Sequence, residues 1–189
     1  MPVRLPSHVV GVDDAPFERG VRGKVAVVGT VYCGLRLDGV LSTSVRRDGS
    51  DATSAIVAMV GRSRFAPQVQ LVMLQGIALA GFNVVDVGAL HLALGIPVLV
   101  VARRRPDLAA IEAALRGRVR GGAAKWRRIQ SAGPMEAVAG VWVQRAGLSL
   151  DVCAQLIERL AIHGNLPEPL RAAHLIAGGL VRGQSRGSA

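Results

Sequence analysis

The feature that most constrains the fold of this chain is a change in hydrophobic periodicity near residue 50. Before that point, apolar and polar residues alternate in β-branched segments, which predicts strands at residues 8–14, 24–37 and 40–45. The pair Asp38-Gly39 between the last two segments is a strong signal for a two-residue hairpin turn. We therefore expect the first 50 residues to form an antiparallel meander.

From residue 51 onward, the pattern predicts helices that alternate with short buried strands. Apolar residues between positions 56 and 60 recur at helical spacing behind a capping Ser50 or Asp51. Largely apolar runs at 69–74 and 98–102 are typical of central strands covered on both faces. The remaining segments predict helices at 84–94, 107–115, 149–162 and 170–181, a strand at 138–143 and a loose basic segment at 116–128.

Three antiparallel strands followed by alternating helices and strands, joined by right-handed crossovers, indicate an α/β fold. One frequent architecture with this order is the ribonuclease H-like core, in which carboxylates from the first strand, a helix and the fourth strand converge on divalent metal ions. Other mixed α/β sheets share the order, so the pattern alone leaves both open. The length of 189 residues predicts a single domain over residues 1–182, and composition predicts a disordered tail at 183–189.

The charge balance points to a polyanionic partner. The chain has 23 Lys and Arg against 13 Asp and Glu, a net charge of +10, and 21 of the 23 bases are Arg, whose planar fork suits phosphate. A surface kept soluble by charge explains the same numbers. No apolar run reaches the ~18 residues that cross a bilayer, and no signal peptide precedes His8. With Cys33 and Cys153 expected as free thiols, we predict a cytoplasmic protein that does not enter the membrane.

The few aspartates stand at the ends of predicted elements. Asp13 and Asp14 end the first strand, Asp48 and Asp51 flank the start of the first helix, and Asp86 follows a Gly-Phe-Asn segment. We expect this topology to bring them to one edge, where oxygen ligands with open water positions suit Mg²⁺ acting on phosphates. Taken singly, Asp13, Asp14, Asp48 and Asp51 are better explained as turn formers or helix caps, so only their convergence favours a metal site.

Two basic stretches are candidates for phosphate contacts. Arg103, Arg104 and Arg105 follow a buried strand on the same predicted edge, although a solvated loop has the same composition. The segment 116–128 interleaves bases with Trp126, which more often anchors a helix in the core than stacks on a base. His91, His163 and His174 show no metal-ligand spacing, and an isolated helical histidine is usually packed or exposed.

Four segments, at residues 11–17, 48–53, 75–86 and 166–177, together resemble the endonuclease dU family, a family related to endonuclease V. They read GVDDAPF, DGSDAT, QGIALAGFNVVD and LPEPLRAAHLIA, and they extend from the first predicted strand to the last predicted helix. The resemblance implies a ribonuclease H-like fold. It also implies Mg²⁺-dependent cleavage of DNA near deaminated bases, especially deoxyuridine.

The resemblance also assigns roles to individual positions. Of the three carboxylates of endonuclease V, the first falls on Asp13, the second near Asp51 and the third on the neutral Gln75. The histidine that endonuclease V has near the start of a late helix falls on Ala146, and the basic residue after the fifth strand falls on Arg103.

These departures have physical consequences. A carboxamide contributes no charge, so we expect weaker binding of a second ion unless Asp14, Asp48 or Asp86 supplies the missing carboxylate. The wedge residues that endonuclease V uses to prise out a base have no counterpart at 45–49. Because unstacking is least costly in unpaired strands, we expect single-stranded or frayed DNA as substrate.

We therefore predict a metal-dependent endodeoxyribonuclease with Mg²⁺ or Mn²⁺ as cofactor. The catalytic residues expected are Asp13, Asp51 and Gln75, the metal ligands Asp13, Asp14, Asp48, Asp51 and Asp86, and the nucleic-acid contacts Arg103, Arg104, Arg105 and Arg171. One alternative is a catalytically silent nucleic-acid-binding protein that lacks the third carboxylate and the histidine. Another is an enzyme acting on a small phosphorylated or nucleoside ligand.

Overall fold

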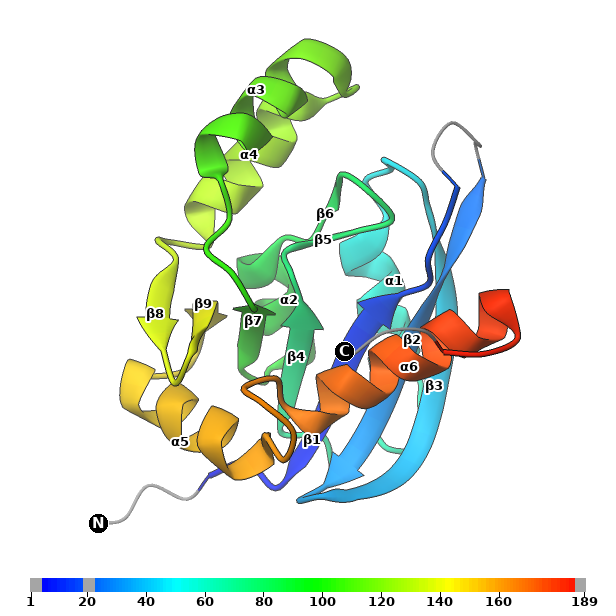
Figure 1. Cartoon of the computed structure of the whole chain (residues 1–189), viewed down its shortest axis with the longest axis vertical. Helices are drawn as coiled ribbons and strands as arrows, with labels where there is room; N and C mark the ends of the chain where they lie inside the picture. The colour runs from blue at the N-terminus through cyan, green and yellow to red at the C-terminus, as the bar shows by residue number, and fades with distance from the viewer. Residues whose placement is uncertain (1–4, 19–22, 186–189) are drawn as a thin grey trace.

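A seven-stranded mixed sheet organises the chain in a computed structural model that describes residues 5–18 and 23–185 (Figure 1). Across the sheet the strands follow the order β3 (Arg36–Arg46), β2 (Lys24–Cys33), β1 (His8–Asp14), β4 (Leu71–Gln75), β7 (Val98–Ala102), β9 (Val141–Ala146) and β8 (Glu136–Val138). The central strands β1, β4 and β7 are parallel, and the outer strands are antiparallel to their neighbours. Residues 71–74 of β4 and 98–101 of β7 are buried, as expected of central strands.

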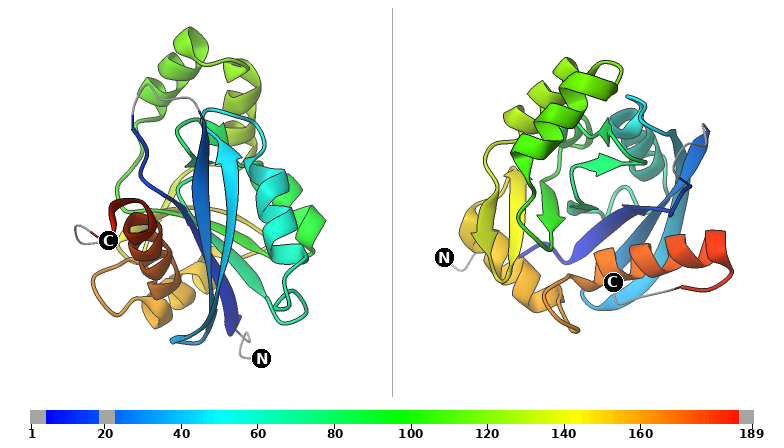
Figure 2. Two further views of the ribbon diagram at one scale, coloured as in Figure 1. Left: turned by 90° about the vertical axis from the view of Figure 1, so that its right-hand side faces the viewer. Right: turned by 45° about the horizontal axis from the view of Figure 1, so that its top comes forward.

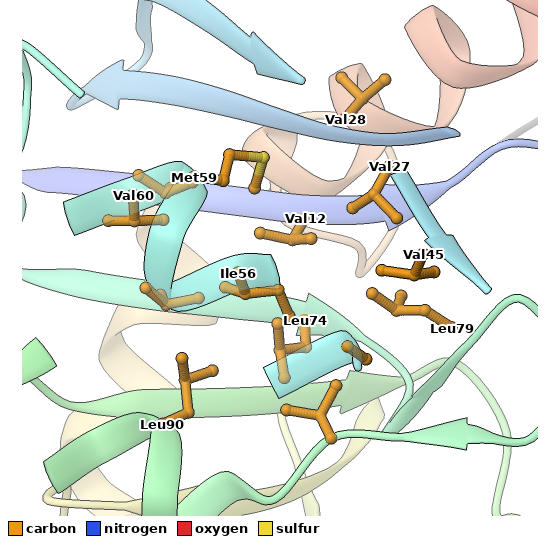
Figure 3. Packing of buried hydrophobic residues seen from close by; sticks show 14 of the residues in the cluster. Val12, Val27, Val28, Val45, Ile56, Met59, Val60, Leu74, Leu79 and Leu90 are labelled. Carbon is orange, nitrogen blue, oxygen red and sulfur yellow. The ribbon is translucent and has the colours of Figure 1, made fainter. Parts of the chain in front are cut away.

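Helices cover both faces of the sheet (Figure 2). One face carries α1 (Ala52–Gly61) and α2 (Val87–Leu94), and the other carries α5 (Leu150–Leu160) and α6 (Glu168–Arg182). Alternation along β1 divides its side chains between the two cores, with Val10 and Val12 on the α1 side and Val9 on the α5 side. Figure 3 shows the first of these cores, where Ile56 and Met59 of α1 meet Val12 and Leu74 of the sheet.

Two smaller units stand at the end of the sheet where β4 and β7 finish (Figure 1). Strands β5 (Ala78–Leu79) and β6 (Asn83–Val84) form a two-stranded hairpin, and α3 (Leu108–Arg118) and α4 (Gly122–Ser131) form a helical hairpin that packs on β6. Trp126 packs with Ile129 and Leu115 in a small apolar cluster there. It therefore anchors α4, as the sequence favoured.

The predicted meander is confirmed, but its hairpin turn is not at Asp38-Gly39. The turn is Gly34-Leu35, and β3 runs on through both predicted turn residues. Gly34 has a φ of 61°, the positive value that two-residue hairpins of the Gly-X type need at their first position. Asp38 lies instead at an irregularity of the ladder, because Val31 pairs with Gly39 and Tyr32 with Leu37.

Three further expectations need correction. Helix α2 begins at Val87, because residues 78–84 form the β5–β6 hairpin instead of the predicted start of a helix. The segment 116–128, expected to be loose, contains the end of α3 and most of α4, and Gly121, the residue before α4, has a left-handed conformation. The last predicted strand is part of a β8–β9 hairpin, and β9 is antiparallel to β7, so no right-handed parallel crossover leads to it.

The predicted fold class is confirmed, with three antiparallel strands followed by helices that alternate with strands. Cys33 is half-buried and Cys153 buried, and both are free thiols as expected. Within the described residues, no helix combines the length and apolar character needed to span a bilayer. Residues 186–189 of the predicted tail lie outside the described part of the chain.

Candidate active site

Asp13 and Gln75 occupy neighbouring positions at the carboxyl ends of two parallel strands. The register pairs Val12 of β1 with Leu74 of β4, so the next residue of each strand lies beside the other. Because side chains alternate along a strand, Asp13 shares the face of Gly11, which packs against α6. Two oxygen-bearing side chains therefore meet beneath α6.

Close packing of α6 on β1 brings a histidine to Asp13. A Cβ atom at Gly11 would collide with the backbone of Pro169. Because glycine has no Cβ atom, the start of α6 can pack directly on the backbone of β1. The buried Thr30 hydroxyl donates a 2.6 Å hydrogen bond to the Pro169 carbonyl and fixes the same turn. Further along the helix, His174 Nδ1 lies 2.8 Å from Asp13 Oδ2. The position of this pair is thus set by a strand and a helix, not by a loop.

The environment of the pair favours a protonated His174. Asp13 is only 5% exposed, and a buried carboxylate needs a hydrogen-bonded or charged partner. The hydrogen bond with Asp13 raises the pKa of His174 because it stabilises the imidazolium, while partial burial and the charges of Arg103 and Arg182 oppose this shift. His174 therefore holds its proton to higher pH than a free histidine.

Gln75 offers an oxygen atom that the fold leaves unused. Its Oε1 is buried and has no hydrogen-bond partner within the described part of the chain. A buried carbonyl oxygen without a donor is costly, so this position is suited to a donor or cation brought by a ligand. The neutral side chain that departs from the family pattern is thus still able to act as an oxygen ligand.

A cavity of about 250 Å³ connects these groups, and its lining includes Asp13, Asp14, Gln75, His174 and Arg182. Burial, followed by repulsion from the Asp13 charge, raises the pKa of Asp14 to about 6, although its Oδ2 accepts a 3.0 Å hydrogen bond from Ala80 N. Two carboxylates beside an unpartnered amide oxygen are the hard oxygen donors that Mg²⁺ and Mn²⁺ prefer. The residues present therefore fit the metal that the family resemblance implies.

The other three predicted metal ligands make local hydrogen bonds away from this cavity. Asp48 Oδ1 accepts a 2.8 Å hydrogen bond from Phe82 N, and Asp51 Oδ1 accepts one of 2.6 Å from Asn83 Nδ2. Asp86 caps α2 by accepting from Ala89 N. None of the three lines the cavity beneath α6. The structure thus brings Asp13 and Asp14 together with Gln75, whereas Asp48 and Asp51 bind the β5–β6 hairpin and Asp86 caps α2.

The predicted basic residues have different environments. Arg103, Arg104 and Arg105 are exposed after β7, and Arg103 is near enough to oppose the protonation of His174. Arg105 stacks over Trp142 at 5.2 Å from the ring centre. Arg171 forms an ion pair with Glu168 at 2.7 Å.

Two functional candidates were missed in the sequence. His174 was treated as an isolated helical histidine, although it lies inside the segment 166–177 that carries the family resemblance. Arg182 lines the cavity and also a second hollow of about 520 Å³ that Lys24 and Arg47 border. Position 146, to which the resemblance assigned the family histidine, pairs with Val98 at the start of β7, away from the carboxyl ends of the parallel strands.

Sequence comparison identifies relatives along almost the whole chain. The sequence profile of a family described as Endonuclease dU matches residues 6–181. A UPF0215 protein of Deinococcus radiodurans is 54% identical over 193 residues, which cover 99% of this chain and 98% of that protein. A UPF0215 protein of Methanothermobacter thermautotrophicus is 44% identical, with 99% and 94% covered.

Solved structures share the fold. A crystal structure of a protein of unknown function from Archaeoglobus fulgidus superposes with a TM-score of 0.85 at 36% identity, covering 92% of this chain and 97% of that one. Endonuclease V of Bacillus subtilis gives a TM-score of 0.62 at 13% identity, with 96% and 84% covered. Endonuclease V of Ciona intestinalis, in complex with DNA containing an inosine followed by a ribo-adenosine, gives 0.55 at 12% identity, with 88% and 82% covered. The chain therefore has the ribonuclease H-like fold of endonuclease V.

Proposed function

The chain belongs to the endonuclease dU family, and from that premise we propose that it is a metal-dependent endonuclease that hydrolyses DNA phosphodiester bonds near deaminated bases. One observation carries the proposal. The Asp13–His174 pair, Asp14 and the unpartnered oxygen of Gln75 line one cavity beside exposed arginines. Acids, an oxygen ligand and a proton donor at one edge of a ribonuclease H-like sheet are the components of phosphodiester hydrolysis.

Asp13, Gln75 and Asp14 would hold the Mg²⁺ or Mn²⁺ ion. Such an ion, when bound, lowers the pKa of a water molecule and stabilises charge on phosphate oxygens. Asp13 contributes a carboxylate that the strand and helix hold in place, and Gln75 contributes the oxygen that lacks a partner. Asp14 joins them once it loses the proton that burial favours.

We assign His174 the role of proton donor in the site. Its Nδ1 is engaged by Asp13, and the raised pKa keeps the imidazolium populated at higher pH. The other ring nitrogen is then a donor that can bind a phosphate oxygen or protonate the leaving oxygen of the cleaved strand. Asp13 thereby orients the ring as well as serving as a ligand.

The exposed arginines would position the strand. Arg103 lies at the edge of the site, Arg104 follows it, and Arg182 lines the cavity. Such groups bind phosphates without reading the sequence of bases. We propose single-stranded or frayed DNA as the preferred form, because unpaired bases cost least to present. A direct metal role for Asp48, Asp51 and Asp86 stays a prediction. The hydrogen bonds of Asp48 and Asp51 support positioning of the β5–β6 hairpin, and that of Asp86 supports the start of α2.

A second candidate is a catalytically silent nucleic-acid-binding protein with the same fold. Gln75 favours it, because a neutral ligand in place of a carboxylate weakens attraction for a second ion. This candidate predicts binding to oligonucleotides that survives EDTA and weakens with salt.

Cleavage of labelled oligonucleotides distinguishes the two functions. Single- and double-stranded substrates, with and without one deoxyuridine or deoxyinosine, are incubated with Mg²⁺, Mn²⁺ or EDTA. The proposal expects cleavage that requires metal, is directed by the lesion and is abolished in Asp13→Asn. Asp107→Asn is the matched control, because Asp107 caps α3 and asparagine caps equally well. Binding in EDTA without cleavage in either metal would instead establish the silent protein.

A further inference from the structure

A second group of ligating side chains lies at the opposite end of β1 from the candidate active site. His8, Cys33 and Asp38 each offer one ligand atom, and these atoms all lie within 4.8 Å of one another. All three residues are half-buried. Asp13 is five residues further along β1, a separation of ~17 Å at ~3.3 Å per residue, so the cluster is distinct from the cavity beneath α6.

The sheet itself assembles this cluster. His8 of β1 is directly opposite Cys33 of β2, and Cys33 is directly opposite Arg36 of β3, so these side chains share one face of the sheet. Asp38 is the extra residue of the bulge in β3, since its neighbours Leu37 and Gly39 both have partners in the ladder. A bulge redirects a side chain, and this one turns a carboxylate toward the imidazole and the thiol.

Neighbouring residues prepare the ligands. Ser7 Oγ lies 3.2 Å from Gln70 Oε1 and 3.1 Å from His8 Nδ1. When Ser7 donates to Gln70, it accepts the proton of His8 Nδ1, and Nε2 is then the nitrogen whose lone pair is available to a metal. Arg36 Nε donates to Asp38 Oδ1 at 2.7 Å and Arg36 Nη2 donates to Asp38 Oδ2 at 3.4 Å, which fixes the orientation of this carboxylate.

We propose that His8, Cys33 and Asp38 form a binding site for a single Zn²⁺ ion. Zinc takes a thiolate, an imidazole and a carboxylate in tetrahedral sites, and three protein ligands leave the fourth position to water. Mg²⁺ is excluded as the preferred ion, because it selects oxygen ligands and this set contains sulfur and nitrogen. The ion would tie the first residue of β1 to the β2–β3 hairpin.

The site differs from the proposed nuclease site in its chemistry. The cavity beneath α6 offers hard oxygen atoms, whereas this cluster contains the half-buried thiol of Cys33. A metal bound through a thiolate has a spectroscopic signature that no oxygen site can give. The zinc proposal therefore does not depend on the nuclease proposal, and its test needs no activity.

Titration with Co²⁺ in place of Zn²⁺ tests the site on the full chain. We expect thiolate-to-cobalt charge-transfer absorption in the near ultraviolet, the visible bands of tetrahedral cobalt, saturation at one ion per chain and displacement by Zn²⁺. We expect Cys33→Ser to lose the charge-transfer absorption. We expect Asp38→Asn to bind Co²⁺ at least tenfold more weakly but to retain the charge-transfer absorption when the ion is bound. Cys153→Ala is the matched control, because it removes the buried thiol on the opposite face and leaves the spectrum unchanged.

Two further measurements do not depend on spectroscopy. Zn²⁺ should slow alkylation of Cys33 by iodoacetamide in the wild type and in Asp13→Asn, but not in His8→Gln. It should also raise the Tm of the wild type more than that of Cys33→Ser. Absence of the charge-transfer band, or a band that persists in Cys33→Ser, would overturn the proposal.

Discussion

Asp13 Oδ2 and His174 Nδ1 lie 2.8 Å apart although the two residues are 161 positions apart in the sequence. The contact joins β1 to α6 at the point where Gln75 and Asp14 also reach the cavity. The contact gives a buried carboxylate a hydrogen-bonded partner and raises the pKa of the histidine.

Replacing the histidine tests its part in cleavage. His174→Gln removes the proton donor and leaves Asp13 without a cationic partner, so we expect the single-turnover cleavage rate to fall by about 10²-fold or more. His163→Gln is the control, because His163 is exposed in the segment between α5 and α6. A His174→Gln protein that cleaves at the wild-type rate would remove His174 from the mechanism.

Restoring a carboxylate at position 75 should strengthen metal binding. Gln75→Asp adds a negative charge beside Asp13 and Asp14, and about 1.4 kcal/mol of added attraction corresponds to tenfold tighter binding. We expect the Mg²⁺ concentration for half-maximal cleavage to fall on the order of tenfold.

The same substitution should destabilise the metal-free protein. Three carboxylates then share one cavity, so the Tm of Gln75→Asp in EDTA should lie below that of the wild type. Gln75→Glu provides a second comparison because it conserves side-chain length. Equal Mg²⁺ dependence in all three proteins would argue against Gln75 as a ligand.

The raised pKa of Asp14 predicts a pH-dependent stability. The folded state holds this proton up to about pH 6, whereas the unfolded chain releases it near 3.8. The free energy of unfolding in EDTA should therefore decrease as the pH rises through this window, by at most about 3 kcal/mol. Asp14→Asn should flatten the decrease and should be more stable than the wild type above about pH 6. Urea unfolding at several pH values measures both effects, and parallel curves for the two proteins would contradict the assignment.

The contact between Gly11 and Pro169 should be intolerant of added volume. Gly11→Ala places a methyl group against the Pro169 backbone, so α6 must shift, at a cost of about 1–3 kcal/mol. We expect a lower Tm and a His174 pKa closer to that of a free histidine, as measured by NMR titration. Gly179→Ala on the same helix is the control, because its Cβ meets nothing closer than 4.0 Å and alanine favours helix. If the pKa of His174 were the same in Gly11→Ala as in the wild type, the position of α6 would not determine the contact between Asp13 and His174.

Much of the fold could be predicted because periodicity reports burial. The apolar runs of β4 and β7 and the meander of β1 to β3 are present as expected. The hairpin turn was placed wrongly because Asp38-Gly39 is the stronger local signal, whereas Gly34 supplies the positive φ and the bulge absorbs Asp38. Helix α4 was missed because its buried lysine, Lys125, reads as a surface residue, although its Nζ donates a 2.6 Å hydrogen bond to the Asp48 carbonyl.

Only those residues of the candidate site that stand at the ends of strands could be predicted from the sequence. Asp13 and Gln75 follow buried runs of adjacent parallel strands, so their proximity is a consequence of topology. His174 could not be placed in the same way, because its approach depends on how closely α6 packs on Gly11. The local hydrogen bonds of Asp48 and Asp51 also depend on the β5–β6 hairpin, which no period in the sequence indicated.

The packing of Pro169 on Gly11 has a consequence for biosynthesis. Translation proceeds from β1 toward α6, and domains form as their segments emerge from the ribosome. The strand that carries Asp13 is made first, but Gly11 is covered by Pro169 only after residues 168–182 have emerged. A nascent chain therefore carries Asp13 without His174, and the pair forms only when synthesis has passed α6.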